Sequence, residues 1–136
     1  MFLVHPGGPF WARKDEGSWS IPKGEFIDED PLAAAKREFR EETSFDISGE
    51  FHPLKPFRQP GGKMVYAWAV EADFDADAVK SNVFSMEWPK NSGKMRKFPE
   101  IDRAGWFSMK EARKKILKSQ VSCLDDIELL FNEQRI

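Results

Sequence analysis

The sequence predicts an α/β protein in which helices cover both faces of a mixed β-sheet. Short apolar runs typical of strands alternate along the chain with segments of helical periodicity, and the chain ends in two such helical segments. The run over residues 63–74 is apolar on both alternating faces, so a strand there has to be covered on both sides. Together these observations favour an α/β/α sandwich, and we expect one domain over residues 1–136.

The first elements are a strand and a turn. Residues 2–4 form an apolar run typical of a strand, and the Pro-Gly-Gly-Pro sequence at 6–9 predicts a turn. Residues 18–21 alternate between polar and apolar types, which predicts a second strand leading into the Pro-Lys-Gly turn at 22–24.

A helix is predicted from Pro31 to about Thr43, because Asp30 is a good N-cap and proline suits the first helical position. On a period of 3.6 residues its apolar stripe comprises Leu32, Ala35 and Phe39. This stripe is expected to pack on the core.

The same helix carries three carboxylates at spacings i, i+3 and i+4, which place Glu38, Glu41 and Glu42 together on another face. Anions in the last turn oppose the helix dipole at a cost of about 0.3 to 1 kcal/mol each, so a bound cation would offset a real penalty. The alternative is a solvated charged face steadied by neighbouring basic residues, which is how most charge runs are used.

The later elements follow from the same signals. An interrupted strand is expected over 51–59, because two prolines break the run, and a glycine-rich turn at 60–62 leads into the strong strand. We expect one helical turn at 76–79, an irregular excursion at 85–99, a last strand at 104–107, and helices over 108–118 and 121–131.

The Pro22-Lys23-Gly24-Glu25 turn and the Arg37-Glu38-Phe39-Arg40-Glu41-Glu42-Thr43 segment resemble the signature of the Nudix hydrolases, G-x5-E-x7-R-E-U-x-E-E-x-G-U, where U is bulky and apolar. The residues that match this pattern are Gly24, Glu29, Arg37, Glu38, Phe39, Glu41, Glu42 and Phe45. The chain departs from it twice: four residues rather than five separate Gly24 from Glu29, and Ser44 replaces the glycine after the helix.

The resemblance implies a Nudix-type α/β/α sandwich and a metal site. Glu38, Glu41 and Glu42 would bind Mg²⁺ or Mn²⁺, the Gly24 carbonyl would complete the coordination, and Arg37 would orient the acidic cluster. The activity implied is metal-dependent hydrolysis of a phosphoanhydride bond in a nucleoside diphosphate linked to another moiety. ADP-ribose, a nucleotide-sugar, a dinucleoside polyphosphate and a nucleoside triphosphate all satisfy that description.

The opening HPGGPFWA…WSIPKGE resembles a group of small bacterial Nudix proteins that usually carry a further strand upstream. We therefore expect a domain that is short at its N-terminus and lacks the usual first strand. Three explanations of the missing strand remain open: a truncated start, a misassigned start, or pairing from another molecule at an exposed sheet edge. The third alternative implies a homodimer.

Several residues outside the acidic helix are candidates for the site. Glu100 is similar in placement to an extra metal-binding or general-base glutamate of some Nudix enzymes, although an ordinary loop acid is an equal alternative. The base would be Glu38 or Glu100. Lys23 is a candidate cation for a substrate phosphate, with an ordinary surface residue as an equal alternative. Trp11 and Trp88 are candidates for stacking on a base, whereas Trp68 and Trp106 are expected to be packed.

Composition narrows the function classes. With a net charge of −2 and a pI of about 5.8, the chain lacks the basic field that attracts nucleic-acid polymers, so a small nucleotide is the expected partner. One cysteine, Cys123, excludes an internal disulfide and suits a reducing compartment, and no run is apolar enough to span a membrane. We expect a cytoplasmic protein, with His5 and His52 in structural roles.

Two other function classes remain open. One is a nucleotide-binding or sensing module that has lost turnover, motivated by the short loop and Ser44. The other is a structural domain whose acidic face binds a basic protein.

Overall fold

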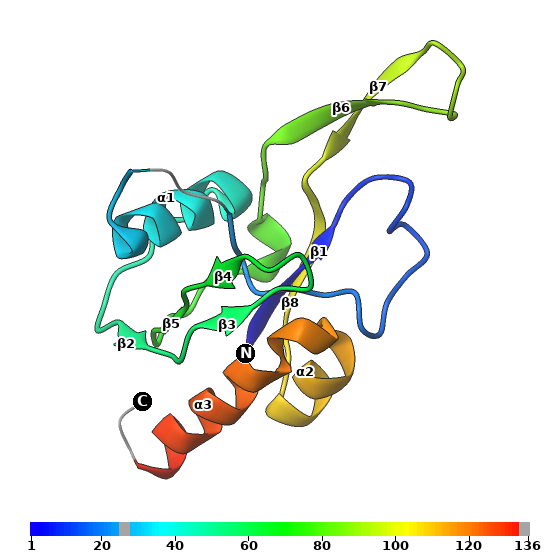
Figure 1. Ribbon diagram of the computed structural model, residues 1–136. Helices are drawn as coiled ribbons and strands as arrows, with labels where there is room; N and C mark the ends of the chain where they lie inside the picture. The colour runs from blue at the N-terminus through cyan, green and yellow to red at the C-terminus, as the bar shows by residue number, and fades with distance from the viewer. Residues whose placement is uncertain (25–27, 134–136) are drawn as a thin grey trace.

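The computed structural model describes residues 1–24 and 28–133 (Figure 1). Its strands are β1 Phe2–Pro6, β2 His52–Pro53, β3 Phe57–Arg58, β4 Met64–Val65, β5 Trp68–Ala69, β6 Val83–Glu87, β7 Met95–Pro99 and β8 Ile101–Trp106. Its helices are α1 Pro31–Thr43, α2 Met109–Lys115 and α3 Val121–Asn132, with short 3₁₀ turns at η1 Ala76–Ala78 and η2 Lys118–Gln120.

Strand β1 lies at the centre of the fold and separates two apolar clusters. Leu3 points to one side, where it packs with residues of α2 and α3 such as Ala112 and Leu124. Phe2 and Val4 point to the other side and pack with Phe39 of α1. Because side chains alternate along a strand, β1 holds helices on both of its faces, and Figure 1 shows α1 on one side and α2 with α3 on the other. The predicted α/β class and its layers are confirmed.

The described strands form four two-stranded antiparallel ladders, β1–β8, β2–β5, β3–β4 and β6–β7. Parallel pairing within the described ranges occurs at the single bridge between Trp19 and Ile116. The strand expected over 18–21 is reduced to this bridge and an antiparallel one between Ser20 and Val4, which lies along β1. The pairing is thus more local than the continuous mixed sheet that the sequence led us to expect.

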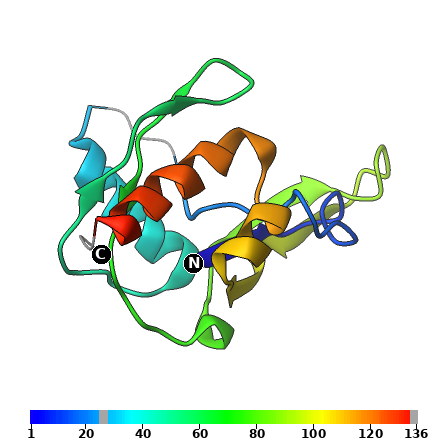
Figure 2. The ribbon, with the colours of Figure 1, turned by 90° about the horizontal axis from the view of Figure 1, so that it is seen from below.

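The strong strand expected over 63–74 is divided into β4 and β5. Its partner segment contains Pro53 and Pro56, and a proline cannot donate a ladder hydrogen bond. The two segments therefore form two short ladders, His52–Pro53 with β5 and Phe57–Arg58 with β4. Figure 2 shows α3, orange to red, lying across the molecule, and its Cys123 and Leu130 belong to the apolar cluster that includes residues of this region.

The excursion expected to be irregular over 85–99 is instead a β-hairpin. Strands β6 and β7 pair from Val83 with Pro99 to Glu87 with Met95, and the hairpin projects from the body of the molecule in Figure 1. The turn-forming Asn91 and Gly93, with φ of 64° and 73°, confine the irregular backbone to the tip. The prediction was wrong because the Pro, Asn and Gly of the tip masked the strands beside it.

The predicted bounds of α1 are confirmed. The Asp30 carboxylate accepts a hydrogen bond from the Ala33 N–H at 3.0 Å, and Ser44 ends the helix with φ of 67°. This left-handed conformation costs a residue with a Cβ about 1 kcal/mol, and the Ser44 hydroxyl compensates by donating to the Lys80 carbonyl. Serine therefore serves in place of the expected glycine.

The C-terminal helices differ slightly from their predicted bounds. Helix α2 ends at Lys115 rather than 118, because Ile116 turns extended and pairs with Trp19. In α3 the buried stripe ends on Leu130, and Phe131 is exposed. No helix of the described ranges is both long and apolar enough to cross a membrane.

The packing of α3 leads to a stability prediction. Leu124 is fully buried between α2 and β1, so Leu124→Ala is expected to lower the free energy of unfolding by about 2 to 5 kcal/mol. The matched control is Leu129→Ala on the same helix, whose side chain is 51% exposed and whose loss should cost about 0.5 kcal/mol or less. Urea unfolding of both variants measures the difference, and equal midpoints would contradict this view of the core.

Candidate active site

Arg37 joins three carboxylates on the exposed side of α1. Its guanidinium nitrogens lie 2.6 Å from Glu29, 3.0 Å from Glu38 and 3.2 Å from Glu41. The hydrogen bonds that Arg37 donates to Glu29 and then to Glu41 hold the pKa of Arg37 above its usual range. Arg37 thus contacts Glu38 and Glu41 on its own helix, and Glu29 is brought to it from the loop.

Glu42 is a partly buried member of the cluster. Its Oε2 accepts a hydrogen bond from the Lys23 backbone N–H at 3.0 Å. The pKa of Glu42 is raised to about 8, mainly by burial; the hydrogen bond from Lys23 opposes this rise, and the charges of Glu38 and Glu100 add to it. The pKa of Glu38 is also raised, first by burial and then by the charge of Glu41. The carboxylates of Glu38, Glu41, Glu42 and Glu100 therefore interact electrostatically.

Gly24 lies directly against Glu38. A Cβ placed on Gly24 would come within 2.0 Å of the Glu38 Cδ and 2.1 Å of its Oε2, so the Glu38 carboxylate would have to move if Gly24 carried a side chain. The short loop between Gly24 and Glu29 includes residues 25–27, which fall outside the described residues. Both ends of that loop nevertheless reach the acidic helix, Gly24 at Glu38 and Glu29 at Arg37.

Glu100 is tied to α1 through the backbone. Its N–H donates to the Asn82 carbonyl at 2.9 Å, and the Asn82 N–H donates to the Glu41 carbonyl at 3.2 Å. On its other side the Glu100 carbonyl accepts from Gly7 at 2.9 Å. A residue that is 59 positions beyond Glu41 in sequence is thereby held next to the acidic helix.

The donor set suits a hard divalent cation. Glu38, Glu41, Glu42 and the Gly24 carbonyl offer only oxygen atoms, which Mg²⁺ and Mn²⁺ prefer. Burial is the first cause of the raised pKa values of Glu38 and Glu42, and the like charges around them add to it. Over the described ranges, no three His, Cys, Asp or Glu side chains already converge in a metal-binding arrangement. Arg37 pairs with Glu38 and Glu41, so a cation binding to these two groups would compete with it.

A cavity of about 1110 Å³ adjoins the acidic cluster through Lys23 and Gly24, which belong to its wall. Much of the rest of the wall is apolar or aromatic, with contributions from Tyr66, Trp68 and Trp106. Trp106 was expected to be packed, but it is 45% exposed, with its indole N–H donating to the Phe74 carbonyl. The alternation of residues 64–70 places Tyr66 and Trp68 on the same strand face, so this sequence pattern can identify the two rings as neighbours in one wall.

The two tryptophans proposed for base stacking lie elsewhere. Trp11 carries the Lys14 ammonium 4.8 Å from its ring centroid, and Trp88 packs edge-on against Phe10. Neither belongs to the wall of the cavity. The structure therefore brings Lys23 to the acidic cluster but leaves Trp11 and Trp88 apart from it.

The histidines and the cysteine have structural surroundings. His5 is fully buried and both of its ring nitrogens have hydrogen-bond partners, while His52 is buried on β2. Cys123 is buried in α3, and burial raises the pKa of its thiol to about 12, which suppresses the thiolate.

A family model described as NUDIX domain matches residues 2–126, a span that contains the glycine turn, the acidic helix and Glu100. No curated protein matches the chain.

The contact between Gly24 and Glu38 predicts that Gly24→Ala displaces the carboxylate and weakens divalent cation binding by about 10-fold or more. Gly61→Ala is the control, because its Cβ would meet nothing within 4 Å. Calorimetric titration with Mn²⁺ measures both variants. Equal Mn²⁺ affinity in the two would show that this contact does not matter to the site.

The burial of Glu42 predicts how stability changes with pH in the absence of metal. Its folded pKa of about 8 lies above its ordinary value of 4.5, so the folded state binds the proton more tightly. The stabilisation is complete below pH 4.5 and is lost as pH rises through 8, by about 2 to 4 kcal/mol in the free energy of unfolding.

Glu42→Gln keeps the shape of the protonated acid and should flatten this dependence. The measurement is urea unfolding in EDTA between pH 5 and about 8.5, with the range set by the shifted and ordinary pKa values. Parallel stability profiles for the wild type and the variant would contradict the assignment of the pH dependence to Glu42.

Proposed function

The chain belongs to the Nudix family, and on that premise we propose that it hydrolyses a phosphoanhydride bond in a nucleoside diphosphate linked to another moiety, using Mg²⁺ or Mn²⁺. Nudix domains in general are pyrophosphohydrolases that act on small nucleotide substrates, so the family supports the reaction type. The identity of the metal, the roles of the residues and the class of substrate are proposed beyond what the family supports.

The observation that carries the proposal is the electrostatic state of the acidic cluster. Glu42 is partly buried and accepts a hydrogen bond from the Lys23 N–H at 3.0 Å, and burial together with the charges of Glu38 and Glu100 raises its pKa to about 8. A divalent cation bound by Glu38, Glu41 and Glu42 would relieve this cost. Stability is thus gained when the site is loaded, as expected for a metal site.

Each residue has a distinct role in the proposed reaction. The bound cation would neutralise the substrate diphosphate and lower the pKa of a water molecule. Arg37 orients Glu38 and Glu41 through its two ion pairs. Lys23 presents its backbone N–H to Glu42 and its side chain to a substrate phosphate. Glu38 or Glu100 takes the proton of the attacking water.

The cavity beside Lys23 and Gly24 is the proposed location of the organic part of the substrate. Its volume, about 1110 Å³, is ample for a nucleoside with a second group, and its aromatic wall supports stacking on a planar base. Stacking on Trp11 and Trp88 remains a separate prediction. From the single cysteine we also infer a reducing, cytoplasmic setting. We further infer that the chain has no polymeric nucleic-acid partner and that it forms a homodimer.

The test is a screen of nucleotide-sugars, ADP-ribose, dinucleoside polyphosphates and nucleoside triphosphates with Mg²⁺ or Mn²⁺. Glu42→Gln is expected to lower kcat by at least about 100-fold, because a metal ligand matters more than the outer groups that typically cost 10 to 100-fold. Glu50→Gln serves as the control, since that side chain is 84% exposed and lies near His52 rather than in the acidic cluster. Unchanged turnover by Glu42→Gln would refute the assignment.

Metal-induced thermal shifts separate the competing functions. A ligand specific for the folded state raises Tm, so Mg²⁺ or Mn²⁺ should stabilise the wild type more than Glu42→Gln. Tight nucleotide binding without product would instead identify a sensing module. Absence of any metal-induced shift would favour a structural domain with a protein partner.

A further inference from the structure

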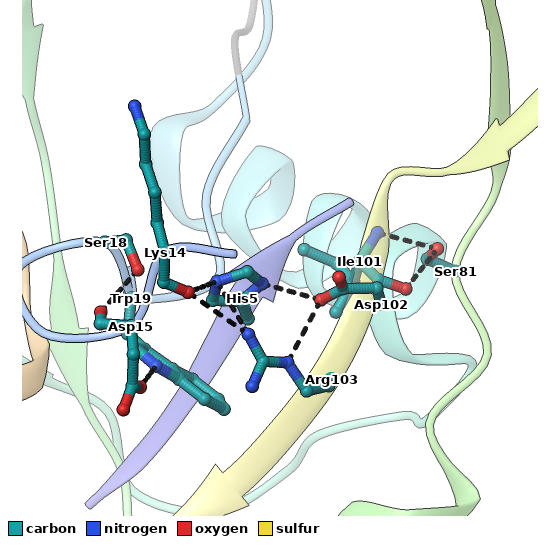
Figure 3. Close-up of polar contacts among 9 residues, drawn as sticks. All are labelled: His5, Lys14, Asp15, Ser18, Trp19, Ser81, Ile101, Asp102 and Arg103. Atoms are coloured by element: carbon teal, nitrogen blue, oxygen red, sulfur yellow. Dashed lines mark hydrogen bonds and ion pairs between the residues drawn. The ribbon is translucent and has the colours of Figure 1, made fainter. Parts of the chain in front are cut away.

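His5 is a buried polar residue that the proposed reaction does not use directly. Its Nδ1 lies 2.7 Å from Asp102 Oδ1, and its Nε2 lies 2.7 Å from the Lys14 carbonyl and 3.0 Å from the Arg103 guanidinium (Figure 3). A carboxylate can only accept, so Nδ1 carries hydrogen and donates to Asp102. The ring also packs edge-on against Trp19, with centroids 5.2 Å apart.

Asp102 occupies an irregular position in the ladder between β1 and β8. His5 pairs with Arg103 and Pro6 pairs with Ile101, so Asp102 has no partner in the register. Such a bulge bends its strand and redirects the adjoining residues, and bulges occur often beside active sites. The hydrogen bond from His5 is the contact that fastens the side chain of the bulged residue to β1.

The backbone before the bulge is the segment that carries Glu100. Gly7 lies so close to it that a Cβ on Gly7 would come within 1.9 Å of the Pro99 carbonyl oxygen. The Gly7 N–H donates to the Glu100 carbonyl at 2.9 Å, and the Ile101 N–H donates to Ser81 Oγ at 3.0 Å. The segment is therefore held by β1 on one side and by the residues that lead into β6 on the other.

Glu100 in turn acts on the acidic helix. Its N–H binds Asn82, which binds the Glu41 carbonyl, and its charge acts on Glu38 and Glu42. A continuous series of contacts thus runs from the His5 ring through Asp102 and Glu100 to α1. An apolar side chain at position 5 would fill the same space but would leave the bulged carboxylate without this donor.

We propose that His5 and Asp102 are positioning residues, which fix the Glu100 carboxylate relative to Glu38 and Glu42 by fastening the bulge of β8 to β1. This inference rests on the proposed function and assigns a role to the His5–Asp102 pair within the same site. Neither residue touches the substrate.

The kinetic test uses Asp102→Ala, measured well below the Tm of every variant. It is expected to lower kcat about 10-fold or more while KM stays within about 2-fold, because outer groups that orient a site typically cost 10 to 100-fold. Asp102→Asn keeps the Oδ1 acceptor for the His5 Nδ1–H and should recover most of the loss. In the Glu100→Gln background, Asp102→Ala should have little further effect on kcat, because residues that act as a unit are not additive.

Asp15→Ala is the matched control. Asp15 lies in the loop next to Lys14, accepts from the Trp19 indole N–H at 2.8 Å and pairs with Lys115 at 2.6 Å, but it does not contact the bulge. It should lower Tm and leave kcat unchanged. Equal kcat values for Asp102→Ala and Asp15→Ala, or an equal effect of Asp102→Ala with and without Glu100, would overturn the inference.

Amide hydrogen exchange tests the inference independently of turnover. The N–H groups of Gly7 and Glu100 both donate hydrogen bonds that hold the Glu100 segment, so Asp102→Ala should speed their exchange more than Asp15→Ala does. Unchanged protection would overturn the positioning role even in an active enzyme. Faster exchange in a protein that hydrolyses no substrate would support the positioning contact and reject the proposed function.

Discussion

Negative charge concentrated at the second half of α1 is the constraint on which the rest of the site depends. Glu38, Glu41 and Glu42 lie within two helical turns, and Glu100 is brought beside them. Like charges at such spacings repel, and the helix C-terminus adds to the penalty. Two groups offset part of this repulsion: Arg37 pairs with Glu38, and the Lys23 N–H donates to Glu42. The absence of a side chain at Gly24 leaves room for the Glu38 carboxylate. A site held together against repulsion in this way is poised to accept a cation.

The opposite face of α1 anchors this strained arrangement. Phe39 packs with Phe2 and Phe74 in a group of aromatic rings whose centroids lie 4.7 to 6.2 Å apart. Edge-to-face contacts of this kind contribute about 0.5 to 1.5 kcal/mol each beyond their buried area. The apolar face of the helix thus packs α1 against β1, and this packing fixes the position of the charged face relative to β1.

The ladder between β1 and β8 connects the two halves of the site. It supplies the core residues on both of its faces, and at its irregular end it holds the Glu100 segment. Core packing and the placement of a candidate base are therefore coupled through one pair of strands. The exposed hairpin of β6 and β7 leaves from this same region, through Asn82 and Glu100.

Local signals in the sequence determined α1 in full, including its Asp30 cap, its end at Thr43 and the spacing of its carboxylates, because caps and the 3.6-residue period act over a few residues. The glycine at position 24 was likewise identifiable from its motif. The tertiary structure alone decided the burial of Glu42, the approach of Glu100 and the bond between His5 and Asp102, which are 97 residues apart. It also decided the β6–β7 hairpin and the aromatic cavity wall. These features arise from contacts between segments distant in sequence, and no local periodicity records which distant partners meet.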